Sequence, residues 1–190
     1  MHHLKALIAR FALPLGLGAA LVVIGGISSA FADSTTATTT ITGGTLTEAV
    51  STTPTVTATL NGTDQTPTYS LDIAGDDNTG SGTGWNLTVT STQFTTGAPL
   101  HTLSATASSL TGVTSVCAQG TCTDPTNATT YPVTVPAGAT PPAGVKFFDA
   151  AANTGMGDFT ITPSIGITIP ANTYAGIYTS TVTLSIVSGP

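Results

Sequence analysis

Two cysteines are the residues of this sequence whose type and spacing best define a chemistry. Cys117 and Cys122 enclose four residues, Ala-Gln-Gly-Thr. A redox-active pair usually has two intervening residues and lies beside a helix, and a structural zinc site needs four ligands. His101 is the only histidine beyond the first three residues, so it cannot complete such a set. The spacing favours a disulfide between Cys117 and Cys122, as in exported proteins, and no metal site.

A group of acidic side chains precedes the single tryptophan. Asp72, Asp76, Asp77 and Asn78 offer the oxygen ligands that Ca²⁺ prefers. Their spacing does not match the calcium loop with its distant glutamate, however. Asp and Asn also favour turns, because their side chains bond to nearby backbone. We therefore expect a turn here, with calcium as the alternative, and we predict no cofactor.

Nothing in the sequence matches an arrangement for catalysis. A serine or cysteine nucleophile needs a positioned base, and no motif surrounds His101. There is no Gly-x-Ser-x-Gly elbow. Glu48 and the aspartates could supply a glycosidase pair, but most aspartates occur in turn-like contexts. The sequence predicts no catalytic residue and a protein that is not an enzyme.

Aromatic residues are the remaining candidates for a binding site. Trp85 follows a glycine-rich turn and alternates with Leu87 and Val89, so these three side chains share one face of a strand. Trp85 could stack on a sugar ring, but its phase favours the core. Phe147 and Phe148 are adjacent and would point to opposite faces of a strand, so one of them could be exposed at a binding surface; the alternative is that both lie under a loop. Trp85, Leu87 and Phe147 are the predicted ligand-binding residues.

Charge limits the possible partners. Lys146 is the only basic residue after Arg10, whereas all nine acidic residues lie at or beyond Asp33. Nucleic-acid binding depends on neutralising phosphates with Lys and Arg, so it is excluded. Electrostatic binding to an anionic membrane is excluded for the same reason.

The N-terminal region has the pattern of an export signal. Lys5 and Arg10 precede an apolar run, and Ala30-Phe31-Ala32 is a cleavage motif. We predict a signal peptide over residues 1–32 and a flexible Thr-rich leader over 33–40. The remaining residues, 41–190, form one domain of ordinary size.

Short alternating segments separated by turns dominate the rest of the chain. The expected strands are 45–47, 55–60, 68–73, 85–94, 100–110, 131–135, 159–169 and 178–186, and the first long pair, 55–60 and 68–73, would form a hairpin around Asn61-Gly62. Residues 111–157 are the least regular part. No helical period is present after Asp33. This pattern predicts an all-β antiparallel sandwich of Greek-key or Ig-like character.

Three stretches together resemble the WxL domain family of bacterial surface proteins. The first runs from Asp76 through the glycine turn to Trp85-Asn86-Leu87, which is the W-x-L itself. The second is Asn153-Thr154-Gly155-Met156-Gly157 before a Phe/Ile-rich strand. The third is the segment from Ala175 to Ile186, ending in Gly189-Pro190. Leu184-Ser185-Ile186 stands where the family usually has a second W-x-L, so the chain resembles a divergent member.

The resemblance implies an exported, surface-associated protein that binds the cell wall non-covalently, with peptidoglycan as the expected partner. It also implies contacts with other surface proteins and no catalysis. The alternative is a structural subunit of a surface fibre, coat or scaffold. Edge strands could accept a neighbour's strand, with the leader as donor, although the leader lacks alternating large apolar residues.

Overall fold

The computed structural model describes residues 34–190, and the predicted signal peptide lies outside the described residues. Residues 34–45 are extended and form no strand. Ten strands follow: β1 (Leu46–Val50), β2 (Thr68–Ser70), β3 (Ile73–Asp77), β4 (Trp85–Thr92), β5 (Ser108–Cys117), β6 (Val133–Thr134), β7 (Ala137–Gly138), β8 (Val145–Ala150), β9 (Gly157–Ile167) and β10 (Val182–Ser188). The described chain has no helix, and thus none that could cross a membrane.

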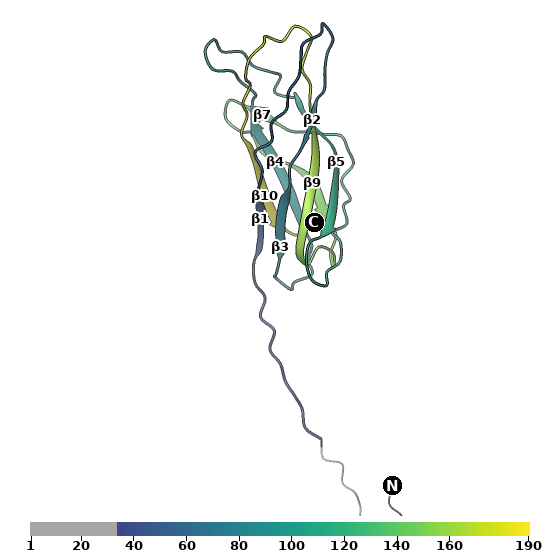
Figure 1. The fold of residues 1–190 in the computed structure, drawn as a ribbon. Coiled ribbons are helices and arrows are strands. Elements are labelled where there is room, and N and C mark those ends of the chain that lie inside the picture. Colours follow the sequence, from purple (N-terminus) through teal and green to yellow (C-terminus); the bar gives the residue numbers. More distant parts are fainter. Residues whose placement is uncertain (1–33) are drawn as a thin grey trace, which may run out of the picture. The chain divides into compact units, whose positions relative to one another are not determined.

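The strands form two sheets packed face to face (Figure 1). The first sheet has the order β1-β3-β9-β5-β6, and β2 pairs with the far end of β9. The second sheet has the order β10-β4-β7, with β8 pairing with β4. All pairs are antiparallel except the short contact between β4 and β7. Most neighbours within a sheet are distant in sequence, and the predicted all-β sandwich is confirmed.

The core forms because β4 and β9 alternate buried and partly exposed residues along their length. Trp85, Leu87 and Val89 face inward, as their spacing predicted. They meet the inward residues Ile73, Phe159 and Ile161 of the first sheet. Burying a side chain of this size contributes roughly 1.5–3 kcal/mol, so this layer holds the two sheets together.

Several strand predictions differ from the structure. Residues 68–73, expected as one strand, divide into β2 and β3, with Leu71 and Asp72 between them. Residues 55–60 alternate like a strand but form none, and β2 pairs with β9 instead of forming a hairpin with them. The strand expected at 100–110 begins only at Ser108 and continues to Cys117, through part of the region expected to be irregular. The last strand begins at Val182 rather than at Tyr178. Alternation alone does not make a strand, because a strand also needs a hydrogen-bonding partner.

A β-bulge explains why both neighbouring phenylalanines of β8 are buried. Leu87 of β4 pairs with Phe148, but the next residue, Thr88, pairs with Lys146, so Phe147 is the extra residue of the bulge. Two residues of a bulged strand oppose one residue of its partner, which breaks the alternation. Phe147 and Phe148 are both fully buried. The interpretation that leaves one of them exposed is therefore wrong.

Candidate functional site

The tryptophan of the W-x-L motif lies at the centre of the core. Trp85 is fully buried between the rings of Phe148 and Phe159, with centroid distances of 5.2 and 4.3 Å and interplanar angles of 17° and 14°. Its Nε1 donates a hydrogen bond of 3.0 Å to the carbonyl oxygen of Gly155. The indole thus has both of the partners that a buried tryptophan requires, an aromatic stack and a hydrogen-bond acceptor.

The glycine segment of the second WxL-like stretch is shaped around this indole. Gly155 has φ of 67°, and a Cβ there would lie 2.8 Å from Nε1 of Trp85. Its own N–H donates to the carbonyl of Thr123, in the loop that follows the cysteine pair. Two of the three stretches that carry the family resemblance therefore meet at Trp85, and Gly155 is needed for their close approach.

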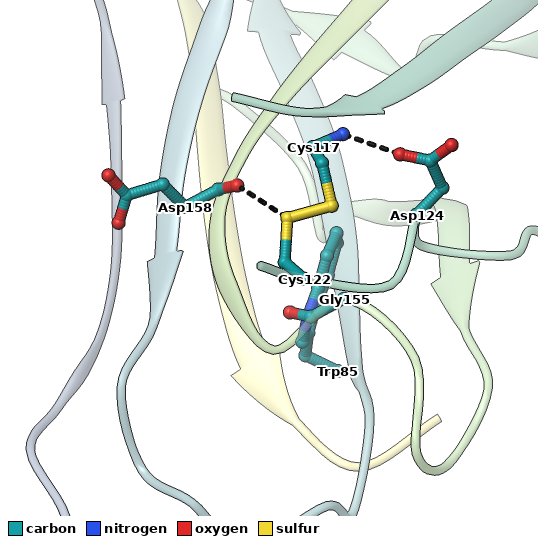
Figure 2. The surroundings of a disulfide bond; sticks show 6 residues. All are labelled: Trp85, Cys117, Cys122, Asp124, Gly155 and Asp158. Atoms are coloured by element: carbon teal, nitrogen blue, oxygen red, sulfur yellow. Dashed lines mark hydrogen bonds between the residues drawn. A yellow bond between two sulfur atoms is a disulfide. The ribbon is translucent and has the colours of Figure 1, made fainter. Parts of the chain in front are cut away.

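The cysteine pair closes the same end of the core (Figure 2). The sulfur atoms of Cys117 and Cys122 are bonded, and the Cα atoms lie 6.0 Å apart, within the usual range for a disulfide. Asp124 accepts a hydrogen bond of 2.6 Å from the backbone N–H of Cys117, which fixes the loop after the bridge. The bridge ties the end of β5 to Cys122, and the carbonyl of the next residue, Thr123, accepts the hydrogen bond from Gly155.

None of the three predicted ligand-binding residues is accessible in this structure. Trp85, Leu87 and Phe147 each have 0 % exposure. No ligand can touch them while the sandwich is folded, and a binding surface has to be formed by other residues. The core interpretation of Trp85, which its phase favoured, agrees with this placement.

The position of the missing second motif is also part of the core. Leu184 and Ile186 of β10 lie directly opposite Val89 and Leu87 of β4, and both pack against the core cluster. In addition, Asn86, the middle residue of the first motif, donates from Nδ2 to the carbonyl of Gly189 at 2.7 Å. The replacement of the second tryptophan by Leu184 therefore keeps an apolar contact at this place.

The acidic stretch is only in part the expected turn, because Asp76 and Asp77 end β3 and the turn begins at Asn78. The Oδ1 atom of Asp77 accepts hydrogen bonds from the N–H and the hydroxyl of Thr79, at 3.1 and 2.6 Å. Within residues 34–190, no three His, Cys, Asp or Glu side chains gather as metal ligands would. Asp76 lies opposite Asp158 on β9. A hydrogen bond from Asp158 raises the pKa of Asp76, and partial burial and the charge of Asp158 raise it further, against a lowering by Thr47.

The neighbour of the His101 imidazole is an aromatic ring, and not the carboxylate that would orient a catalytic histidine. Its imidazole stacks on the ring of Tyr174, with a centroid distance of 4.0 Å and an interplanar angle of 11°. In the described part of the chain no carboxylate hydrogen-bonds to this imidazole. The hydrogen bonds near it are local ones, such as that from the N–H of His101 to the hydroxyl of Thr96.

Exposed apolar side chains gather beside this stack. Leu100, Tyr174 and Ile177 are 70 %, 66 % and 85 % exposed, and with His101 they form what we call the apical platform. Two loops carry it, residues 95–101 and 171–178, both at the end of the sandwich drawn uppermost in Figure 1. The loops are held together where Gly176 approaches Thr96 closely. Exposed apolar groups on neighbouring loops make this end a candidate binding surface.

A groove of about 1060 Å³ begins beside the platform, and we call it the edge groove. Residues 52–60 form one wall, and residues 173–182 with Leu184 form the other. Apolar side chains of Phe94, Leu103 and Ile167 line it, and no charged residue of the described chain does. Its volume lies at the upper end of the range for ligand sites.

The platform and the groove were not singled out by the sequence. Tyr174 and Ile177 lie in a segment that reads only as a loop between two strands. A large apolar residue in a turn is a weak signal, because single exposed apolar residues are normal. Only the fold brings His101, more than 70 residues away in the chain, next to Tyr174.

The comparison with known families agrees with the stretches around Trp85, Gly155 and the C-terminus. Residues 29–190 match the WxL family, described as a WxL domain that is surface cell wall-binding. The chain therefore belongs to the WxL domain family. No curated protein and no solved structure matches it. The family is one of cell-surface, wall-binding domains and not of catalysts.

Proposed function

We propose that this protein is exported and binds peptidoglycan non-covalently, without catalysis, through the apical platform. In this proposal residues 1–32 are removed as a signal peptide, residues 33–40 are a leader, and residues 41–190 are the binding domain. Wall binding is the property of the family as a whole. The single observation that supports the location is the exposed ring of Tyr174.

The geometry of Tyr174 suits a sugar ring. The imidazole of His101 covers one face of the tyrosine ring, and the side chain remains 66 % exposed. The face of an aromatic ring carries partial negative charge and attracts the C–H groups of an apolar surface, such as one side of a pyranose. Leu100 and Ile177 extend the apolar surface on both loops.

Charge favours the glycan over phosphate-containing wall polymers. Lys146 is the only lysine or arginine among the described residues, and its Nζ atom lies 3.4 Å from Oδ1 of Asp149. Binding of a polyanion depends on several free cationic groups, which the described chain lacks. An uncharged sugar chain meets no such requirement.

The experiment is co-sedimentation with purified cell walls, before and after chemical removal of their phosphate-containing polymers. We expect the wild type to pellet with both preparations, Tyr174→Ser to remain in the supernatant, and Tyr174→Trp to pellet. Val116→Ser is the matched control, because Val116 is an exposed apolar residue on the outer face of the first sheet. A wild type that stays in the supernatant with stripped walls would overturn the proposal.

A further inference from the structure

One segment of the sandwich has no backbone partner. The chain leaves the first sheet after Val50 and runs extended through residues 52–58, all exposed except the half-buried Val56. Within the described chain, no hydrogen bond involves the backbone of residues 52–58. Extended backbone with free N–H and C=O groups is a template for another strand.

The opposite wall of the edge groove is also an open edge. Among the described strands, β10 has β4 as its one hydrogen-bonded neighbour, so its other side is unpaired. Edge strands are usually protected by charge, proline or a bulge, and β10 (Val182–Ser188) has none of these. The groove thus lies between the unpaired backbone of residues 52–58 and a wall to which β10 contributes Val182 and Leu184, with an apolar floor that includes Leu103 and Ile167.

We propose that the edge groove accepts an extended strand from a second copy of this chain, formed by residues 34–42 with Ile41 inserted into the apolar floor. The incoming backbone bonds to residues 52–58 or to the free side of β10, which is the strand-addition mode of recognition. The groove is incomplete without the second copy.

The donor segment, residues 34–42, has the length for this role and carries no charged side chain. Nine extended residues span about 30 Å, more than the length of the unpaired segment. Residues 34–45 contain no charged side chain, and neither does the lining of the groove. The two parts therefore meet without the repulsion that the acidic surface would otherwise impose. Ile41 is 89 % exposed, the highest value among the large apolar residues described.

The position of the leader favours a second copy as its source. Gly44 is fixed by a hydrogen bond of 2.6 Å from its N–H to the carbonyl of Asn78, just before β1 begins. The groove starts beyond Val50, at the other end of β1. The donor segment is thus attached to the domain at the end of β1 opposite to the groove. Such a head-to-tail contact repeats from one subunit to the next and produces chains of subunits, or a ring where the rotation closes.

The experiment uses two variants expressed from the full-length gene, exported, and checked for their N-terminus by mass spectrometry. Ile41→Asp places a carboxylate in the donor segment, and Thr57→Asp places one in the acceptor wall. We expect the wild type to form oligomers that grow with concentration in sedimentation velocity. Each variant alone stays monomeric, and a mixture of the two forms 1:1 dimers, because each supplies the part that the other lacks.

Val116→Asp is the control, since it adds the same charge to an exposed apolar site away from the groove. Circular dichroism checks that all variants are folded. A wild type that is monomeric at every concentration would overturn the inference, and so would variants that assemble like the wild type or a mixture that stays monomeric. Wall binding is scored separately: Leu100→Ser, at a platform residue outside the groove lining, should still assemble, and Ile41→Asp should still pellet with walls.

Discussion

The two ends of this sandwich differ in the packing and hydrogen-bonding partners that their residues have. At the tryptophan end, the buried Trp85 bonds to the carbonyl of Gly155, whose N–H bonds in turn to Thr123, the residue after the half-buried Cys117–Cys122 bridge. At the apical end, loops present Leu100, Tyr174 and Ile177 to solvent, and residues 52–58 have no backbone partner within the described chain. The difference indicates that the W-x-L motif stabilises the fold, and it supports the proposal that binding occurs at the opposite end.

The largest effect is expected from removing the indole. Trp85→Ala should lower the free energy of unfolding by about 3–5 kcal/mol, because it leaves a cavity between two aromatic rings. Tyr174→Ser should change it by less than about 0.5 kcal/mol, as is usual at exposed sites. Urea denaturation of both variants measures the contrast. Equal losses would contradict the assignment of one end to stability and the other to binding.

The next effect concerns glycines at the two ends. Gly75→Ala should destabilise the fold by about 1–3 kcal/mol, because a Cβ at Gly75 overlaps the ring of Phe159. Gly97→Ala in an apical loop should be nearly neutral, since nothing lies within 4 Å of its Cβ position. Thermal unfolding compares the two. A Gly97 variant as damaged as the Gly75 variant would show that the apical loops are tightly packed and that the two ends do not differ in this respect.

Breaking the disulfide should have a moderate effect. The bridge spans five positions in sequence, and a loop of this size contributes about 2 kcal/mol through the unfolded state. We expect Cys117→Ser/Cys122→Ser to lose this amount in urea titrations. Tryptophan fluorescence should be unchanged in the folded variant, because Trp85 keeps its stacking partners. A shifted emission would mean that the bridge also positions the indole.

The smallest effect is a pH dependence on the outer face of the first sheet. Asp158 raises the pKa of Asp76 above its ordinary value of 3.8, so the folded state binds the proton more tightly than the unfolded state. This pair is therefore unfavourable at neutral pH, and its cost disappears as the pH falls through the raised pKa. Asp76→Asn should be slightly more stable than the wild type at neutral pH, with the gap closing in acid.

Glu48→Gln is the control for this titration, because Glu48 lies opposite Gly75 and has no carboxylate across the strand pair. Stability is measured by urea denaturation at several pH values. If the gap between Asp76→Asn and the wild type widened in acid, the pKa of Asp76 would have to be lowered rather than raised by folding.

The sequence by itself determined the class of fold and the composition of its core. The alternation of Trp85, Leu87 and Val89 predicted one inward face, and the two cysteines predicted their bridge. These features depend on residues close together in the chain. The family resemblance rests on local stretches for the same reason.

Only the tertiary structure decided which parts pair and which remain free. The bulge that buries both Phe147 and Phe148 depends on the register of β8 against β4. Residues 55–60 have the alternation of a strand but no partner strand in the described chain. Their expected partner, β2, pairs with β9 instead. The apical platform and the edge groove likewise arise from contacts between segments far apart in sequence. Pairing and exposure are properties of the assembled chain, and local patterns do not contain them.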